Sequence, residues 1–275
     1  MEKKIKFFIK NTFIKFISNF LFNINKLIEL LPFRLLKKKS KRAKKLIIKY
    51  QIKFYCEHLP YFYKEPVFVI IGANDGLNDH YSDIILNNKK CKGLLIEPFP
   101  YNIKRLKANY QDSRRFLLEQ VAIDSTPGEA TFYSVDPSAY KIINCRKHSL
   151  DRIGSLDRKH LLKFFNGALE QFIIETKVKV CTLSCILKKN RIRDIHFLQI
   201  DTEGNDFEVL KTLDFAIFSP LMIIVEHIHL SNKRKTEMVK LLQKNHYSII
   251  KYGIDFIALN KKFKINFNYK MDEIS

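Results

Sequence analysis

The residues best suited to chemistry stand directly after short apolar runs of the chain. Glycine, carboxylate and imidazole groups at such places could bind a ligand or move a proton. They are Gly72, Ala73, Asn74, Asp75, Gly76, Glu97, Asp201, Glu203, Glu226, His227 and His229. In open α/β sheets, ligands bind outside the carboxyl ends of the strands, near the point where the strand order reverses. The spacing therefore predicts one site assembled from several segments.

The earliest of these segments, Gly72–Gly76, suits a backbone that turns tightly beside a ligand. Its two glycines accept positive φ, and the N-terminus of a following helix is electropositive. It lacks the G-x-G-x-x-G spacing of dinucleotide-binding loops, which argues against NAD. Glu97 follows one β-α-β step later, and a carboxylate there can accept hydrogen bonds from both hydroxyls of a ribose. Together, the two segments favour a nucleoside-type cofactor.

The later polar groups have simpler explanations that stay open. Asp201 could cap a helix, Glu203 could form a salt bridge, and His229 could be an ordinary surface histidine. The cluster could also bind a divalent metal ion, but no ligand spacing supports this, so a metal is not favoured. The five cysteines form neither a C-x-x-C pair nor a disulfide framework, which indicates free thiols in a reducing compartment such as the cytoplasm.

The elements that must position these groups alternate between buried strands and helices. Strands are expected at 67–71, 93–96, 116–123, 128–133, 196–200, 221–225, 247–252 and 255–259. Helices are expected at 81–86, 100–110, 183–189, 207–213 and 234–245. This rhythm predicts an α/β fold with a mostly parallel, doubly wound sheet. The last two strands, joined by a turn containing Gly253, predict an antiparallel hairpin at the sheet edge.

Three segments are predicted along the chain. Residues 1–62 form a basic amphipathic helical extension, 63–262 form the main domain, and 263–275 form a tail. Within the domain, 125–178 reads as an irregular insertion with some helical pattern, on the side where the substrate binds.

The formal net charge of +21 is concentrated near the start, where residues 1–65 carry 17 Lys and Arg against 4 Asp and Glu. No stretch near the start is long and apolar enough to span a bilayer, and no cleavable signal is evident. An amphipathic helix followed by a basic run suits the inner surface of an anionic membrane, contacted through residues 1–45. The alternatives are that this helix packs on the domain or on a second copy of the chain in a homodimer. Part of the charge could also reflect the base composition of an A+T-rich genome, which favours Lys, Asn, Ile and Phe, rather than a binding partner.

Several motifs together resemble the FkbM family of S-adenosylmethionine-dependent methyltransferases. They are Ile71–Gly76, Ile96–Pro98, Val121–Ile123, Ser155–His160, Phe197–Asp206 with its Asp-x-Glu-Gly block, and Val225–His227, within about 66–260. The resemblance implies a Rossmann-like class I methyltransferase fold. It also implies that Gly72–Gly76 surround the methionine end of the cofactor, that Glu97 binds its ribose, and that Ala122 and Asp201 contact it. Ile70 departs from the family, because many members carry an acid there; Asp75 is the nearest replacement.

The function implied is O-methylation of a sugar hydroxyl in a glycan, a glycolipid or a secondary metabolite. The cofactor supplies an activated methyl group, so the protein must align the hydroxyl and take its proton. Asp201 or Glu203 is the expected base, with His227 as the alternative. An RNA or other nucleic-acid methyltransferase is a rival, but no Asn/Asp-Pro-Pro-aromatic turn or Arg/Lys–aromatic stripe favours nucleic acid. A catalytically inactive, membrane-associated scaffold is the other rival.

Overall fold

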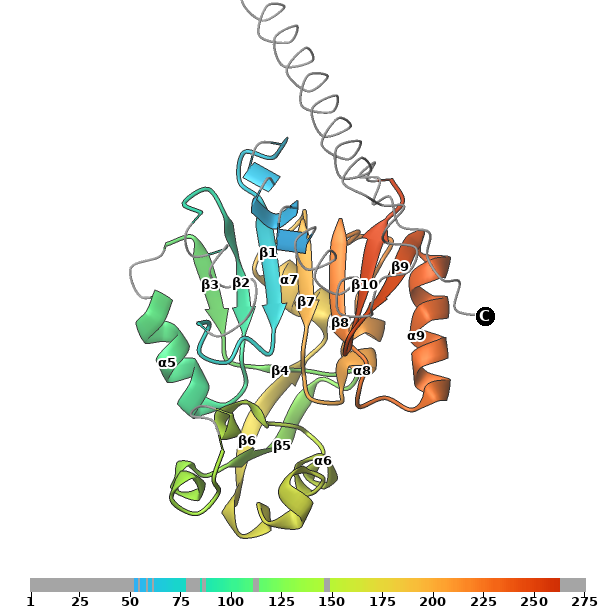
Figure 1. Cartoon of the computed structure of the whole chain (residues 1–275). Helices are drawn as coiled ribbons and strands as arrows, with labels where there is room; N and C mark the ends of the chain where they lie inside the picture. Colours follow the sequence, from blue (N-terminus) through green and yellow to red (C-terminus); the bar gives the residue numbers. More distant parts are fainter. Residues whose placement is uncertain are drawn as a thin grey trace, which may run out of the picture. The chain divides into compact units, whose positions relative to one another are not determined.

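A mostly parallel sheet of seven strands forms the centre of the described part of the chain (Figure 1). The order is β3-β2-β1-β7-β8-β10-β9, and only the β9–β10 hairpin runs antiparallel to its neighbours. These strands are β1 (Val67–Ile71), β2 (Lys92–Ile96), β3 (Phe116–Glu119), β7 (Phe197–Ile200), β8 (Met222–Glu226), β9 (Tyr247–Tyr252) and β10 (Asp255–Asn260). The chain runs outward from β1 in one direction and from β7 in the other. The order therefore reverses between β1 and β7, where an α/β sheet binds its ligand.

This computed structural model describes residues 52–262, apart from 54, 58, 61, 78–84, 86–87, 111–113 and 146–148. The described residues belong to one unit, Gln51–Ile265. The helix predicted in the first forty residues, the tail at 263–275 and nearly all of the helix at 81–86 lie outside the described residues. Within the described residues, no helix has the length and apolarity to cross a membrane.

The helices α5 (Pro100–Tyr110), α7 (Leu183–Lys189), α8 (Asp206–Lys211) and α9 (Asn232–Lys244) connect the strands. Every residue of β1 is buried, because both faces of the sheet are covered. One shared core joins Val69 of β1 and Leu198 of β7 to Leu187 of α7 and Met238 of α9. The predicted α/β fold with a mostly parallel sheet and a terminal hairpin is confirmed.

The insertion forms a second sheet, which Figure 1 shows beyond the carboxyl ends of β1 and β7. Its strands are β4 (Ala122–Ile123), β6 (Ile173–Cys181) and β5 (Gly128–Val135), in that order. Between β5 and β6 lie α6 (Arg158–Leu162) and the 3₁₀ turns η1 (Pro137–Lys141), η2 (Leu150–Arg152), η3 (Phe164–Gly167) and η4 (Glu170–Phe172). Their buried side chains form a separate small core that contains Val135, Leu150 and Leu161.

Two expectations about this region are wrong. The single strand expected at 116–123 is two strands in different sheets: β3 ends at Glu119, and β4 pairs with β6 instead. Val121, Ala122 and Ile123 are all buried, so no alternation marks the change of sheet. The long strand β6 was not expected, although its ladder with β5 pairs Gly128 with Val180 and Val135 with Ile173.

Candidate active site

A cavity of about 350 Å³ opens at the carboxyl ends of β1, β2, β7 and β8 and is closed on one side by the insertion. Most of the predicted site residues line it together: Gly72, Ala73, Asn74, Asp75, Glu97, Ala122, Asp201 and Glu203. Gly76 and His227 are not among the lining residues. The insertion contributes five further lining residues, Phe132, Asp151, Arg152, Gly154 and Leu156.

The turn after β1 takes a left-handed path, with φ of +79° at Gly72, +51° at Asn74 and +74° at Gly76. A Cβ on Gly72 would lie 1.8 Å from the carbonyl oxygen of Asp201, so only glycine lets β1 and β7 approach this closely. A Cβ on Gly76 would instead meet side chains of α5. Gly76 therefore packs the turn onto that helix rather than facing the cavity.

Glu97, at the end of β2, is held by the turn beside it. Its Oε2 accepts a hydrogen bond from the backbone N–H of Asn74, and its Oε1 accepts one from that of Phe99, both at 2.9 Å. Burial raises the pKa of Glu97 to about 7, against the opposing effect of these hydrogen bonds. The side chain of Asn102 also hydrogen-bonds to Glu97 and lowers its pKa. A carboxylate offers about four acceptor positions, so some capacity for hydroxyl groups remains.

A charged network from α5 supports the turn and was missed by the sequence interpretation. Arg105 forms an ion pair with Asp75, and its Nη1 lies 2.8 Å from Oδ2 of Asp151 in the insertion. Asn102 donates to the carbonyl oxygen of Asp151 at 2.8 Å and to Oδ1 of Asn74 at 3.1 Å. The carboxylate of Asp75 is thus engaged by a guanidinium. In the sequence, the only indication of this network is that Asn102 and Arg105 are three residues apart and so share one face of the predicted helix.

The Asp-x-Glu-Gly block forms a tight turn built around Asp206. This carboxylate accepts hydrogen bonds from the backbone N–H groups of Thr202 at 2.8 Å and Gly204 at 3.1 Å. Burial raises the pKa of Asp206 to about 6. With Glu203 at φ +53° and Gly204 at φ +102°, the turn presents the Glu203 side chain to the cavity.

Acceptor oxygens gather on the cavity wall between β7 and β8. Oε1 of Gln199 and Oε2 of Glu226 are buried and have no hydrogen-bond partner among the described residues. Burial, together with the nearby carboxylates of Asp201, Asp206 and Glu203, raises the pKa of Glu226. Buried acceptors without donors favour a ligand that brings positive charge or N–H groups.

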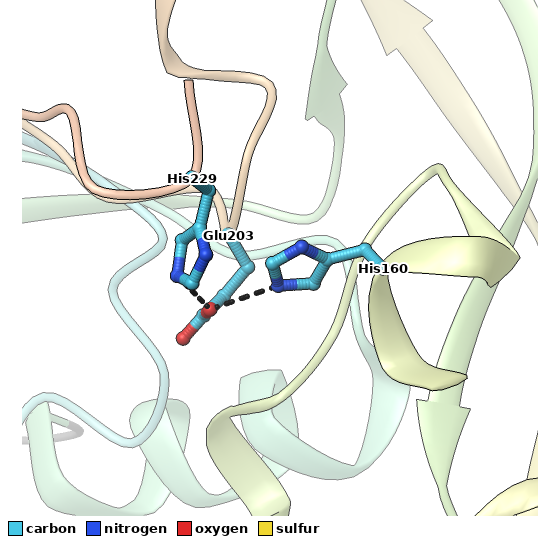
Figure 2. Close-up of side chains that lie close together, drawn as sticks. All are labelled: His160, Glu203 and His229. Carbon is cyan, nitrogen blue, oxygen red and sulfur yellow. Dashed lines mark hydrogen bonds and ion pairs between the residues drawn. The ribbon is translucent and has the colours of Figure 1, made fainter. Parts of the chain in front are cut away.

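Two histidines converge on Glu203 at the edge of this wall (Figure 2). The Nε2 of His160 lies 3.1 Å, and the Nε2 of His229 3.4 Å, from Oε2 of Glu203. Burial alone would raise the pKa of Glu203, but the hydrogen bonds and charges of the two histidines lower it overall. His160 lies in the Ser155–His160 motif, for which the sequence predicted no role, whereas His229 was predicted to join the polar cluster, with an ordinary surface histidine as the alternative. His160 could not be linked to Glu203 without knowing how the insertion folds, whereas His229 follows β8, which pairs with β7.

His227 is placed differently from the other predicted residues. Its ring packs on Phe256 at a centroid distance of 4.2 Å, and neither ring nitrogen has a hydrogen-bond partner among the described residues. Burial lowers the pKa of His227 to about 4. The structure does not bring this imidazole to the cavity wall.

A parallel sheet with a glycine turn after β1, an acid after β2 and Asp-x-Glu-Gly after β7, all around one cavity, defines a Rossmann-like methyltransferase fold. The profile of the methyltransferase FkbM domain matches residues 71–249, more than half of the chain. The protein therefore belongs to the FkbM methyltransferase family, an S-adenosylmethionine-dependent class. The predicted family and the predicted enzyme class, methyltransferase, are confirmed.

Solved structures with a similar fold include methyltransferase FkbM from Methylobacillus flagellatus KT. It is 16% identical over 71% of this chain and 44% of its own, with a TM-score of 0.42. Fibrillarin from Aeropyrum pernix, solved with natively bound S-adenosyl-L-methionine, is 8% identical over 70% of this chain and 65% of its own, with a TM-score of 0.36. The chain thus spans less than half of the FkbM structure. No curated protein matches the chain.

Proposed function

We propose that this protein is an S-adenosylmethionine-dependent O-methyltransferase that acts on a sugar hydroxyl of a glycan, a glycolipid or a secondary metabolite. The observation that carries the proposal is the single cavity lined by the Gly72 turn, Glu97 and Asp201. Its volume of about 350 Å³ falls within the range of roughly 300–1,000 Å³ for small-molecule sites.

The residues present fit this cofactor. The remaining acceptor capacity of Glu97 suits the ribose hydroxyls, and Ala122 supplies an apolar part of the wall. The buried oxygens of Gln199 and Glu226, which have no hydrogen-bond partner among the described residues, suit the ammonium and sulfonium charges. These two oxygens could take the role of the acidic side chain that many family members carry at the position of Ile70. Asp75 is less suited to that role, because Arg105 already neutralises it.

The cofactor supplies the activated methyl group, and the chain must align the acceptor and take its proton. Glu203 lines the cavity and has two imidazoles behind it, so it is placed to accept the proton from a hydroxyl and share it with them. Asp201, beside the turn after β1, is the alternative base.

The test measures transfer of a labelled methyl group to glycan and glycolipid extracts by wild type, Asp201→Asn and a control, His246→Asn. His246 is exposed and has φ +67°, a conformation that asparagine tolerates. We expect a labelled glycan product with wild type and the control, and a loss of at least about tenfold with Asp201→Asn. Label that enters RNA instead of glycans would support the nucleic-acid alternative and overturn the proposal.

We also propose that the protein works in the cytoplasm at an anionic membrane surface. The described residues support this at the amino ends of the strands, opposite the candidate active site. A second cavity of about 850 Å³ there is lined by six Lys and Arg residues, Lys64, Lys92, Arg114, Arg115, Arg191 and Arg193. Two acidic residues, Glu65 and Asp194, also line it, and Glu65 forms an ion pair with Lys92 at 2.9 Å. Each Lys or Arg near anionic lipid contributes about 1 kcal/mol, in addition to any contribution from residues 1–45.

Sedimentation with lipid vesicles tests this localisation. We expect binding to vesicles that contain anionic lipid, no binding to neutral vesicles, and release at high salt. A dimer that binds neither vesicle type would instead support packing of residues 1–45 on a second copy.

A further inference from the structure

We propose that His160, Glu203 and His229 form a binding site for one divalent ion of a first-row transition metal. The candidate ligand atoms, one from each residue, all lie within 4.8 Å of one another. Both imidazole Nε2 atoms approach the same carboxylate oxygen (Figure 2). No ligand spacing along the chain favours a metal, because the three residues are far apart in the sequence.

The observed spacing is close to that of ligands around a metal ion. Bonds of about 2.1 Å to nitrogen and oxygen place neighbouring ligand atoms about 3.0 Å apart at octahedral angles and about 3.4 Å apart at tetrahedral angles. The two N···O distances from Glu203 are 3.1 Å to His160 and 3.4 Å to His229. An ion can therefore enter with small side-chain movements.

Three separate elements hold the ligands in place. His160 lies on α6, whose first turn is capped by the Asp157 side chain accepting from the Lys159 N–H. The backbone carbonyl of Glu203 accepts a hydrogen bond from Oγ of Ser155 at 3.1 Å, which ties the turn after β7 to the insertion. The third ligand, His229, follows β8. A site supported in this way is pre-organised for an ion.

The donor set indicates the class of metal. Two imidazoles and one carboxylate suit zinc and its first-row neighbours, whereas magnesium and calcium prefer oxygen ligands alone. The His160 side chain is 3% exposed, but those of Glu203 and His229 are 21% and 24% exposed. This leaves an accessible side for water or a substrate oxygen. Oε2 of Glu226 lies 3.5 Å from Nε2 of His229, so a further carboxylate borders the site.

The role of the ion rests on the proposed function, although binding of the ion does not. Glu203 also lines the cavity, so an ion there would stand beside the acceptor hydroxyl and lower its pKa. Because Glu203 would hold the ion, the hydroxyl proton would pass to Asp201, the alternative base. The acceptor oxygen would bond to the methyl carbon, and the electron pair of the breaking carbon–sulfur bond would stay on sulfur. The products are the methyl ether, the demethylated cofactor and one proton.

The experiment titrates chelator-treated full-length protein with Zn²⁺ by calorimetry, using wild type, His229→Asn, Glu203→Gln and the control His246→Asn. We expect one Zn²⁺ per chain in wild type and control, and affinity lower by about 100-fold or more in the two site variants. Co²⁺ gives a second readout, because its visible absorption bands report nitrogen and oxygen ligands. These bands should be lost in the same two variants.

Absence of Zn²⁺ binding to wild type, or equal affinity in all four proteins, would overturn the proposal. The result would then favour a simple hydrogen-bonded cluster, in which each histidine donates from Nε2 to Glu203. Circular dichroism is used to check that His229→Asn is folded; this partly exposed position is the safer of the two histidines to change. Cofactor binding, measured on the same samples, separates failure of the metal site from failure of the proposed function.

Discussion

The buried carboxyl of Glu97 predicts that cofactor affinity rises with pH. Only the ionised form can accept hydrogen bonds from both ribose hydroxyls while it also accepts the N–H groups of Asn74 and Phe99. With a pKa of about 7, roughly one carboxyl in eleven is ionised at pH 6 and roughly ten in eleven at pH 8. We therefore expect affinity for S-adenosylmethionine to rise about tenfold between these two values.

The assay is calorimetry at pH 6, 7 and 8 with wild type and Glu97→Gln. The glutamine does not titrate, so the ratio of the two affinities at each pH cancels the titration of the cofactor and of other groups. Repeating the pH 6 titration in buffers with different ionisation enthalpies should show nearly one proton released on binding to wild type. A wild-type to variant ratio that stays constant from pH 6 to 8 would refute the reasoning.

In the cofactor-free protein, the effect of Glu97 on stability falls as pH rises, whereas its effect on cofactor affinity increases. The folded pKa of Glu97 lies above the ordinary value, so its contribution to stability is complete below about pH 4.5 and is lost as pH rises through about 7. Glu97→Gln should therefore gain stability relative to wild type as the pH increases to 8, while it loses cofactor affinity. Denaturant unfolding of both proteins at pH 5 and 8 measures this.

Three further predictions concern the scaffold. Gly72→Ala should destabilise the fold by about 2–4 kcal/mol, since positive φ and overlap with the Asp201 carbonyl add together. Gly128 also has positive φ, but nothing lies within 4 Å of a Cβ placed there. Gly128→Ala should therefore lose clearly less free energy of unfolding than Gly72→Ala, as measured for both by denaturant unfolding. Arg105→Met should lower the free energy of unfolding by about 3 kcal/mol, because two buried aspartates lose the guanidinium that they share. His227→Leu should retain more stability than wild type as pH falls below 6.5, since the buried imidazole resists protonation; equal acid unfolding curves would contradict this.

The local elements could be predicted where one short segment carries the whole signal. The run Val67–Ile71 is β-branched and apolar because it is buried on both faces, and the predicted bounds agree with those of β1. The helix 100–110 begins at a proline, which suits the first helical position, and its predicted bounds also agree. Helix 183–189 was equally recognisable.

Features that depend on distant partners were not predictable. The chain changes sheets between Glu119 and Ala122 because β6 offers a partner about sixty residues later, and nothing local marks this change. The meeting of the cavity residues followed from a general rule about strand ends, so Glu97 and Asp201 could be grouped in advance. The convergence of His160 and Glu203 required the fold of the insertion.

A crystal structure with the demethylated cofactor, S-adenosylhomocysteine, tests the central claim most directly. The account predicts this ligand in the cavity, with its ribose hydroxyl oxygens about 2.5–3.0 Å from the carboxylate of Glu97 and its sulfur facing the Asp201 and Glu203 side. A ligand bound elsewhere, or a ribose out of reach of Glu97, would contradict it.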